Sequence, residues 1–311
     1  MKIIAFIPAY NEEKTIGDVV KGAMGFVDEV IVVDDGSRDG TAQKAREAGA
    51  IVHSNPRNLG VGATFKNGVT LAMEHGADAL VTLDGDNQFY VEDVPRILEP
   101  ILNGTADLVT GTRFPKEGMG QEMGRTKAFG NRFFSKLISR LTGFEFSDTQ
   151  CGFRAYSKEA LLRLNLYGRF TYTQEVFLNL VNKNLIVTEV PIKVKLRKTG
   201  KSRVVKNPFQ YGTRALKIIL LAERDHYPLR FFGIISAIFF ILSGAAFLTV
   251  LLNWLITNQT SPFSNLITLG GFFSLVGVLL LIIALIADML GRQRQIQEEI
   301  LYRLRQEHYK K

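Results

Sequence analysis

The chain has 311 residues, which is enough for one or two domains with a large hydrophobic core. Its formal net charge is +8, and its single cysteine, Cys151, excludes an intramolecular disulfide. No Asp, Glu, Lys or Arg occurs from Phe231 to Ala287, although charged residues make up 22% of the sequence. The chain therefore joins an ordinary globular part to a segment that is unusual in a soluble protein.

The first part of the chain alternates short apolar runs with amphipathic segments. The apolar runs predict strands at residues 3–7, 29–33, 51–53, 79–83 and 107–111, and the segments between them predict helices at 12–25, 41–48, 62–74 and 91–102. This alternation predicts an α/β fold with a mainly parallel central sheet, covered by helices on both faces. Such sheets bind ligands at the carboxyl ends of their strands, so the residues that follow each strand are the candidate site.

Polar side chains follow four of these strands. They are Pro8, Tyr10 and Glu12 after the first strand, Asp34 and Asp35 after the second, Asp84, Asp86 and Gln88 after the fourth, and Arg113 after the fifth. Turn chemistry alone explains one such cluster, but four clusters at one edge favour a binding site. Asp34 or Asp35 can accept hydrogen bonds from a base or a ribose, and Tyr10 can pack on a base.

The stretch LDGDNQ places two aspartates one residue apart after an apolar run. Asp84 and Asp86 can act on one divalent ion, with Gln88 as a neutral oxygen ligand, and hard oxygen ligands suit Mg²⁺ or Mn²⁺. Such an ion would bridge a diphosphate. The forked donors of Arg113 suit a phosphate.

A basic stretch precedes the uncharged segment. The next predicted elements are a helix at residues 129–141, a strand at 185–196 and an amphipathic helix at 208–221. Nine Lys or Arg and no acid lie between Lys193 and Lys217, which indicates an anionic membrane surface or an anionic substrate. Nucleic acid is the competing interpretation, and we set it aside because the neighbouring apolar segment already explains the position.

Two apolar stretches predict a transmembrane hairpin. Residues 231–257 and 266–287 are each long enough to span a bilayer, with a polar break between them; a buried hairpin of a soluble protein is the alternative. Arginines flank the hairpin on both sides and the connecting loop carries no charge, so both termini are expected in the cytoplasm of a cell-membrane protein. The expected organisation is an α/β domain at 1–205, interfacial amphipathic helices at 206–228, the hairpin at 229–290 and a cytoplasmic amphipathic helix at 291–311.

Six short blocks resemble one enzyme family. The blocks FIPAYNEE, VVDDGSRDGT, NLGVGAT, LDGDNQ, GTRF and DTQCGFRA occur in the order and spacing of inverting family 2 glycosyltransferases with the GT-A fold. The resemblance covers residues 1 to about 205. It implies that LDGDNQ is the D-x-D motif, in which Asp84, Asp86 and Gln88 meet the donor diphosphate and its metal ion. It also implies that Pro8, Tyr10, Glu12 and Asp35 form the nucleotide pocket.

A later block narrows the resemblance. Residues 197–203, RKTGKSR, are similar to the R-x-x-G-x-S-K/R segment of dolichyl-phosphate mannose synthases and related polyprenyl-phosphate glycosyltransferases. The resemblance implies that Arg113, Arg125 and Arg203 bind the lipid phosphate, and that Arg197 and Lys201 bind the donor. Asp86, Arg113 and Arg125 are then the expected catalytic residues.

The reaction implied is attack by a polyprenyl phosphate on the anomeric carbon of a nucleotide sugar, with inversion. A phosphate monoester has its second pKa at about 6, so it needs little help from a general base. Glu175 is a candidate base or donor contact, and a purely structural role is equally open. The expected partners are the nucleotide sugar, dolichyl or another polyprenyl phosphate and membrane lipids, and not nucleic acid. GDP-mannose, UDP-glucose and UDP-N-acetylglucosamine all remain open as donors.

Two other functions compete with this interpretation. A processive polysaccharide synthase carries a Q-x-x-R-W segment after its catalytic domain, whereas the single tryptophan here, Trp254, lies in the first apolar stretch. The other competitor is a catalytically inert, membrane-tethered protein that binds a nucleotide sugar. The presence of Asp84, Asp86, Gln88 and Arg113 argues against it.

Overall fold

The structure is a computed structural model that describes residues 1–113, 135–136, 138–140, 143–166, 172–181, 183–195, 220–221, 224 and 227–310. The chain divides into two compact units. Unit 1 comprises Met1–Lys206 with Tyr302–Lys311, and unit 2 comprises Asn207–Leu301. Each unit is described by itself.

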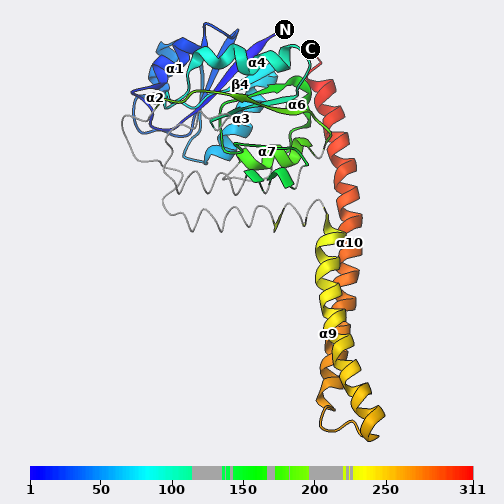
Figure 1. The fold of residues 1–311 in the computed structure, drawn as a ribbon. Helices are drawn as coiled ribbons and strands as arrows, with labels where there is room; N and C mark the ends of the chain where they lie inside the picture. Colours follow the sequence, from blue (N-terminus) through cyan, green and yellow to red (C-terminus); the bar gives the residue numbers. More distant parts are fainter. Residues whose placement is uncertain are drawn as a thin grey trace. The chain divides into compact units, whose positions relative to one another are not determined.

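Unit 1 is built on a seven-stranded sheet (Figure 1). Its strands are β1 (Ile3–Ala9), β2 (Glu29–Asp34), β3 (Ile51–Ser54), β4 (Ala79–Thr82), β5 (Leu108–Thr112), β6 (Arg154–Ser157) and β7 (Val187–Pro191). They lie in the order β3-β2-β1-β4-β6-β5-β7. Only β6 runs antiparallel to its neighbours among these strands; the other pairs are parallel. The predicted mainly parallel sheet is confirmed, but the sequence analysis missed β6.

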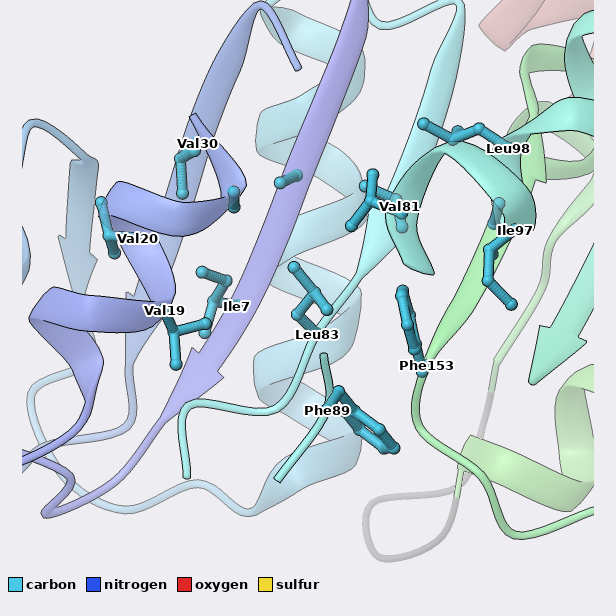
Figure 2. Close-up of a cluster of buried hydrophobic side chains, with 14 of the residues drawn as sticks. Ile7, Val19, Val20, Val30, Val81, Leu83, Phe89, Ile97, Leu98 and Phe153 are labelled. Atoms are coloured by element: carbon cyan, nitrogen blue, oxygen red, sulfur yellow. The ribbon is translucent and has the colours of Figure 1, made fainter. Parts of the chain in front are cut away.

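Helices cover both faces of this sheet. They are α1 (Ile16–Ala23), α2 (Thr41–Glu47), α3 (Val61–Glu74), the short 3₁₀ helix η1 (Val91–Asp93), α4 (Val94–Leu102), α6 (Lys158–Arg163) and α7 (Tyr172–Val181). Figure 2 shows one buried cluster, where Val19 and Val20 of α1 and Ile97 of α4 lie over Ile7 and Val81 of the sheet. Strands buried on both faces need apolar residues at nearly every position, which explains the continuous apolar runs in the sequence.

The opposite face is closed by aromatic side chains. The ring centroids of Phe6 in β1 and Phe65 in α3 lie 5.9 Å apart, and the same distance separates Phe65 from Tyr156 in β6. Gly68 lies where α3 crosses β1, because a Cβ atom there would come within 2.2 Å of the Phe6 ring. The close approach of helix and sheet therefore depends on this glycine.

Several element boundaries differ from the prediction. The predicted helix at 12–25 begins only at Ile16, because Thr15 turns its hydroxyl towards the Gly85 carbonyl oxygen, 2.7 Å away. The predicted strand at 185–196 is shorter, and an isolated bridge between Phe89 and Val194 follows it. Most of the residues in the predicted helices at 129–141 and 208–221 lie outside the described part of the chain.

Within unit 1, the last helical turns of the chain, from Tyr302 onwards, form hydrogen bonds with α6. Arg305 donates hydrogen bonds from its Nη1 atom to the end of that helix. The acceptors are the carbonyl oxygens of Leu162 and Leu164 and Asn165 Oδ1, each 3.0 Å away. The Tyr302 hydroxyl donates to Glu159 over 2.9 Å, and the Arg163 guanidinium lies 3.9 Å from the centre of the Tyr302 ring. These contacts satisfy carbonyl groups that a helix end otherwise leaves without a partner.

Unit 2 consists mainly of two long apolar helices. They are α9 (Pro228–Thr257) and the major part of α10 (Asn265–His308), and both are long and apolar enough to cross a membrane. Large apolar side chains point outwards, with Ile241 70% exposed and Ile256 83% exposed. An apolar outer surface on two antiparallel helices is the arrangement expected of a membrane hairpin.

Small residues line the contact between these two helices. Ser236 donates to the Gly277 carbonyl oxygen over 2.7 Å, and Ser243 donates to that of Gly270 over 2.8 Å. The serines are seven residues apart on α9, and so are the glycines on α10. Small and hydroxyl-bearing residues of this kind allow close packing and add interhelical hydrogen bonds in apolar surroundings.

We expect Arg305→Ala to destabilise unit 1 by about 1–3 kcal/mol, because three buried or half-buried acceptors lose their charged donor. Thermal unfolding of the full chain in detergent measures the change. Lys310→Ala is the matched control, since it removes the same charge from an exposed position of the same segment. Equal unfolding temperatures for the two variants would contradict a fastening role of Arg305.

Candidate active site

The loops that follow β1 and β2 are tied together by side chains. The Asn11 amide donates to Ser37 Oγ and the Glu12 amide donates to Thr41 Oγ1, both over 2.8 Å. In return the Arg38 amide donates to Asn11 Oδ1 over 2.9 Å. Asn11 has a φ of 53°, a left-handed conformation that Asn tolerates better than most residues. The sequence therefore holds the first two polar loops in one fixed arrangement.

Asp34 and Asp35, expected to bind the donor, both have partners within the protein. Each is only 4% exposed. The donors to the Asp35 carboxylate are Asn55 Nδ2 and the backbone amides of Leu59 and Gly60, at 2.8–2.9 Å. Asp34 Oδ1 accepts from the Ser37 amide over 3.2 Å. Asp35 thus shapes the loop at 55–60, and a direct contact of either aspartate with the donor stays a prediction.

The LDGDNQ stretch forms a tight turn at the carboxyl end of β4. Asp84, Asp86 and Gln88 are half-buried, and the Gln88 amide donates to Asp86 Oδ1 over 3.1 Å. Asn87 adopts a φ of 56°, which turns the chain sharply between Asp86 and Gln88. The turn thereby gathers the carboxylates of Asp84 and Asp86 and the amide of Gln88 within the five positions after Leu83.

The segment before β6 packs against this turn. Thr82 donates to the Gly152 carbonyl oxygen over 2.6 Å, and a Cβ atom at Gly152 would approach Asp84 Oδ1 within 2.9 Å. Arg154 is fully buried and donates to three main-chain carbonyls. These belong to Thr149, Cys151 and Thr173, at 2.9–3.1 Å. Because β6 is antiparallel, its first residues lie at the edge where β4 and β5 end.

The charges at this edge strongly affect Asp84. Burial and the charges of Asp86 and Glu12 together raise the pKa of Asp84 to about 7, against the opposing charges of Arg113 and Arg154. The carboxylates therefore crowd one another, and a cation beside Asp84 and Asp86 would relieve both burial and repulsion.

The donor set fits a small divalent ion that also binds substrate. No group of three or more His, Cys, Asp or Glu side chains in the described residues is arranged to hold a metal by itself. Mg²⁺ and similar ions are commonly held by one or two carboxylates together with substrate phosphates. Asp84 and Asp86, with Gln88 beside them, match this mode of binding.

Arg113 lies at the end of β5 and forms a bidentate ion pair with Asp148. Nε and Nη2 of Arg113 lie 2.6 and 3.0 Å from the two carboxylate oxygens. Burial lowers the pKa of Arg113, but the hydrogen bonds and charge of Asp148 outweigh this effect and raise it overall. The arginine thus stays charged, held in one orientation close enough to interact with Asp84.

The chain passes this turn again before the basic stretch. The Lys195 amide donates to the Gln88 carbonyl oxygen over 2.8 Å, and Lys195 Nζ lies 3.0 Å from Asn87 Oδ1. The segment that contains Arg197, Lys201 and Arg203 begins directly after this contact. These three residues and Arg125 lie outside the described residues, so their expected roles stay predictions. Glu175 lies in α7, and its role also stays a prediction.

The sequence analysis missed four residues that shape the site. They are Asp148, Gly152, Arg154 and Glu189. The first three belong to the DTQCGFRA block, which was noticed as a motif without being placed at the sheet edge. Their place in the site depends on the antiparallel strand at 154–157, which the sequence pattern does not predict. Four residues are too few for a clear periodic pattern.

Residues 4–164 match the profile of the family described as Glycosyl transferase family 2. A relative from Methanococcus voltae, a UDP-N-acetylglucosamine–dolichyl-phosphate N-acetylglucosaminyltransferase, is 34% identical over 61% of this chain and 84% of its own. An undecaprenyl-phosphate 4-deoxy-4-formamido-L-arabinose transferase from Aeromonas hydrophila is 26% identical over 92% of this chain and 87% of its own. The chain belongs to glycosyl transferase family 2.

A solved structure supports the same fold. Glucosyl-3-phosphoglycerate synthase from Mycobacterium tuberculosis, crystallised with Mn²⁺, UDP and glucosyl-3-phosphoglycerate, has a TM-score of 0.55 and 21% identity. The similarity covers 71% of this chain and 78% of that one. Unit 1 therefore has the GT-A fold, and the chain is a glycosyltransferase.

The raised pKa of Asp84 predicts a pH-dependent stability without metal. The stability that comes from a protonated Asp84 is fully present below its ordinary pKa of 3.8 and is lost as the pH rises through about 7. In EDTA, we therefore expect the stability of Asp84→Asn relative to that of the unmodified chain to increase as the pH rises from about 5 to about 8. Thermal unfolding at the two pH values measures the gain.

Asp78, at the start of β4, is the matched control. A hydrogen bond from the Lys2 amide and the charge of Lys158 lower its pKa, so it is ionised at both pH values. Asp78→Asn should lose similar stability at both. A gain for Asp84→Asn that does not change with pH would contradict the assignment of a raised pKa to Asp84.

Proposed function

We propose that this chain transfers a hexose from a nucleotide sugar to dolichyl or another polyprenyl phosphate, with inversion at the anomeric carbon. The observation that carries the proposal is the meeting of Asp84, Asp86 and Arg113 at one sheet edge, in a family 2 glycosyltransferase. The names of the relatives support the acceptor class, because both act on a polyprenyl phosphate. The product is a lipid-phosphate-linked sugar that donates to glycan assembly.

The donor would bind across the ends of β1, β2 and β4. The residues proposed for it are Pro8, Tyr10, Glu12, Asp34, Asp35, Asp84, Asp86, Arg197 and Lys201. Asp84, Asp86 and Gln88 would hold Mg²⁺ or Mn²⁺, which when bound neutralises the charge on the leaving diphosphate. The fixed β1 and β2 loops support this assignment, since a rigid pocket loses little conformational freedom when it binds a ligand.

The acceptor phosphate would meet Arg113, Arg125 and Arg203. A phosphate monoester is largely ionised near neutral pH, because its second pKa is about 6, and it can attack without a strong general base. The chain must then bring two anions together, and arginine guanidinium groups are suited to that task. The role of Glu175 is then either a contact with the donor or a structural one.

The hairpin of α9 and α10 would anchor the enzyme in a cell membrane. Arg224 and Arg230 precede the first span, and Arg292 and Arg294 follow the end of the uncharged segment. The positive-inside rule then places the catalytic unit and both termini in the cytoplasm. Cysteine scanning of the loop at 258–265 with an impermeant thiol reagent in intact cells tests this orientation.

Incubation of membranes with radiolabelled UDP-N-acetylglucosamine, UDP-glucose or GDP-mannose, with polyprenyl phosphate and Mn²⁺, tests the reaction directly. We expect one donor to give a labelled product that extracts into organic solvent. Label in an insoluble polymer would favour a processive synthase. The absence of both a labelled product and donor hydrolysis, with all three donors, would favour an inert binding protein.

We expect Asp86→Asn to reduce kcat/KM on the order of a thousandfold, because the leaving diphosphate loses most of its charge compensation. Lipid extraction of the labelled product measures the loss. Asp18→Asn, on the exposed side of α1, removes the same charge away from the site and should leave turnover unchanged. Full activity of Asp86→Asn would refute the metal assignment.

We expect Arg113→Ala to raise the KM for polyprenyl phosphate about tenfold or more, with a smaller change in the KM for the donor. Arg113→Lys retains the positive charge without the forked donors. Its KM for polyprenyl phosphate should therefore lie between those of the unmodified chain and of Arg113→Ala. Arg46→Ala, an exposed arginine of α2, is the control. An unchanged dependence on lipid in both Arg113 variants would remove this residue from the acceptor site.

A further inference from the structure

Arg113 interacts with carboxylates of two different loops. Asp148 holds it in a bidentate pair, with the Asp148 side chain fully buried and that of Arg113 22% exposed. Arg113 also interacts electrostatically with Asp84, whose pKa it lowers against the effects of burial and of Asp86. The direction in which the guanidinium turns therefore decides whether Asp84 and Asp86 keep their negative charge available.

Asp148 is itself held by a second carboxylate, which is half-buried. Glu189 of β7 accepts hydrogen bonds from the backbone amides of Ser147 and Asp148, each over 2.9 Å. Glu189 pairs in register with Thr110 of β5, three residues before Arg113. The contact fixes the backbone of Asp148 relative to the strand that ends at Arg113.

The Arg113–Asp148 ion pair and its support by Glu189 are energetically unfavourable if they serve only to stabilise the fold. A buried ion pair contributes little net stability, since desolvation offsets most of the attraction between its charges. Here a buried carboxylate, Asp148, and a half-buried one, Glu189, act in series on one arginine at the edge of the site. Such an arrangement is better explained by the need to control where the guanidinium points.

We propose that Asp148 is a positioning residue that holds Arg113 away from the Asp84–Asp86 pair, and that Glu189 fixes Asp148 for this purpose. Without Asp148, the guanidinium would turn to Asp84, with which it already interacts electrostatically, and so to the Asp84–Asp86 pair. It would then compete with the divalent ion for the same oxygens. This inference rests on the proposed function, because it concerns the cation assigned there to Asp84 and Asp86.

The test is the affinity of the full chain in detergent for Mn²⁺ alone, measured from the electron paramagnetic resonance signal of free Mn²⁺. We expect Asp148→Asn to weaken binding about tenfold, equivalent to about 1.4 kcal/mol. Glu189→Gln keeps one acceptor oxygen for the backbone amides, so we expect a smaller loss of about threefold, or about 0.7 kcal/mol.

The decisive variant is the double substitution Asp148→Asn with Arg113→Gln. If Asp148 acts only by restraining Arg113, removal of the guanidinium restores Mn²⁺ affinity to at least that of the unmodified chain. If Asp148 merely stabilises the loop, the double variant binds as weakly as Asp148→Asn or more weakly, and the proposal is overturned. Glu159→Gln removes an ion-paired carboxylate from α6 and should leave Mn²⁺ affinity unchanged.

The outcomes of this experiment distinguish a failure of this inference from a failure of the proposed function. Failure of the unmodified chain to bind Mn²⁺, both alone and in the presence of UDP or GDP, overturns both the metal assignment and the inference that depends on it. Normal binding by the unmodified chain together with equal binding by Asp148→Asn overturns the inference alone. Unfolding temperatures of all variants show whether a loss of affinity accompanies a loss of fold, and Glu189→Gln provides the milder change if Asp148→Asn does not fold.

Discussion

Strand β6 runs antiparallel between β4 and β5, and this pairing brings the segment before it to the edge at which its neighbours end. In a wholly parallel sheet that segment would lie at the opposite edge, far from the turn that carries Asp84. Here Gly152 packs against the Asp84 carboxylate and Asp148 reaches Arg113. A single reversal of strand direction thus brings together the loop with the carboxylates and the loop that holds their neighbouring arginine.

The site is a balance of buried charges rather than a single polar pocket. Asp84, Asp86 and Glu12 repel one another at one edge, while Arg113 and Arg154 partly compensate. Each arginine is restrained in a different way: Arg154 by main-chain carbonyls and Arg113 by a carboxylate. Restraint matters because a mobile guanidinium would pair with the carboxylates and remove the charge that a cation or a diphosphate complex needs.

The surrounding loops are held by the same kind of hydrogen bond between side chain and main chain. Ser37 of the β2 loop and Thr41 at the start of α2 accept from the β1 loop, and the Thr15 hydroxyl donates to the Gly85 carbonyl oxygen. In the hairpin, Ser236 and Ser243 bind carbonyls of the facing helix in the same manner. Short hydroxyl and amide side chains lose little conformational freedom in such bonds, so they make loops rigid without a large core.

The sequence by itself determined the parts that depend on local patterns. Apolar runs and helical periodicity located nine of the elements of unit 1 to within a few residues at most ends, and the long uncharged segment located the two apolar helices. The residues after β1, β2, β4 and β5 were identified as the candidate site, because parallel strands must end at a common edge. The family resemblance, which depends on short local blocks, was confirmed by the family profile that matches residues 4–164.

Only the tertiary structure decided the direction of β6, the pairing of Asp148 with Arg113, and the use of Asp35 to hold the loop at 55–60. These contacts join residues separated by 20 to 78 positions along the chain. Local periodicity carries no information about which distant strand a four-residue segment will pair with, or which of several nearby arginines a buried aspartate will bind. Those choices are made when the whole sheet closes, because the register of each strand is set by its neighbours and by the burial of both faces.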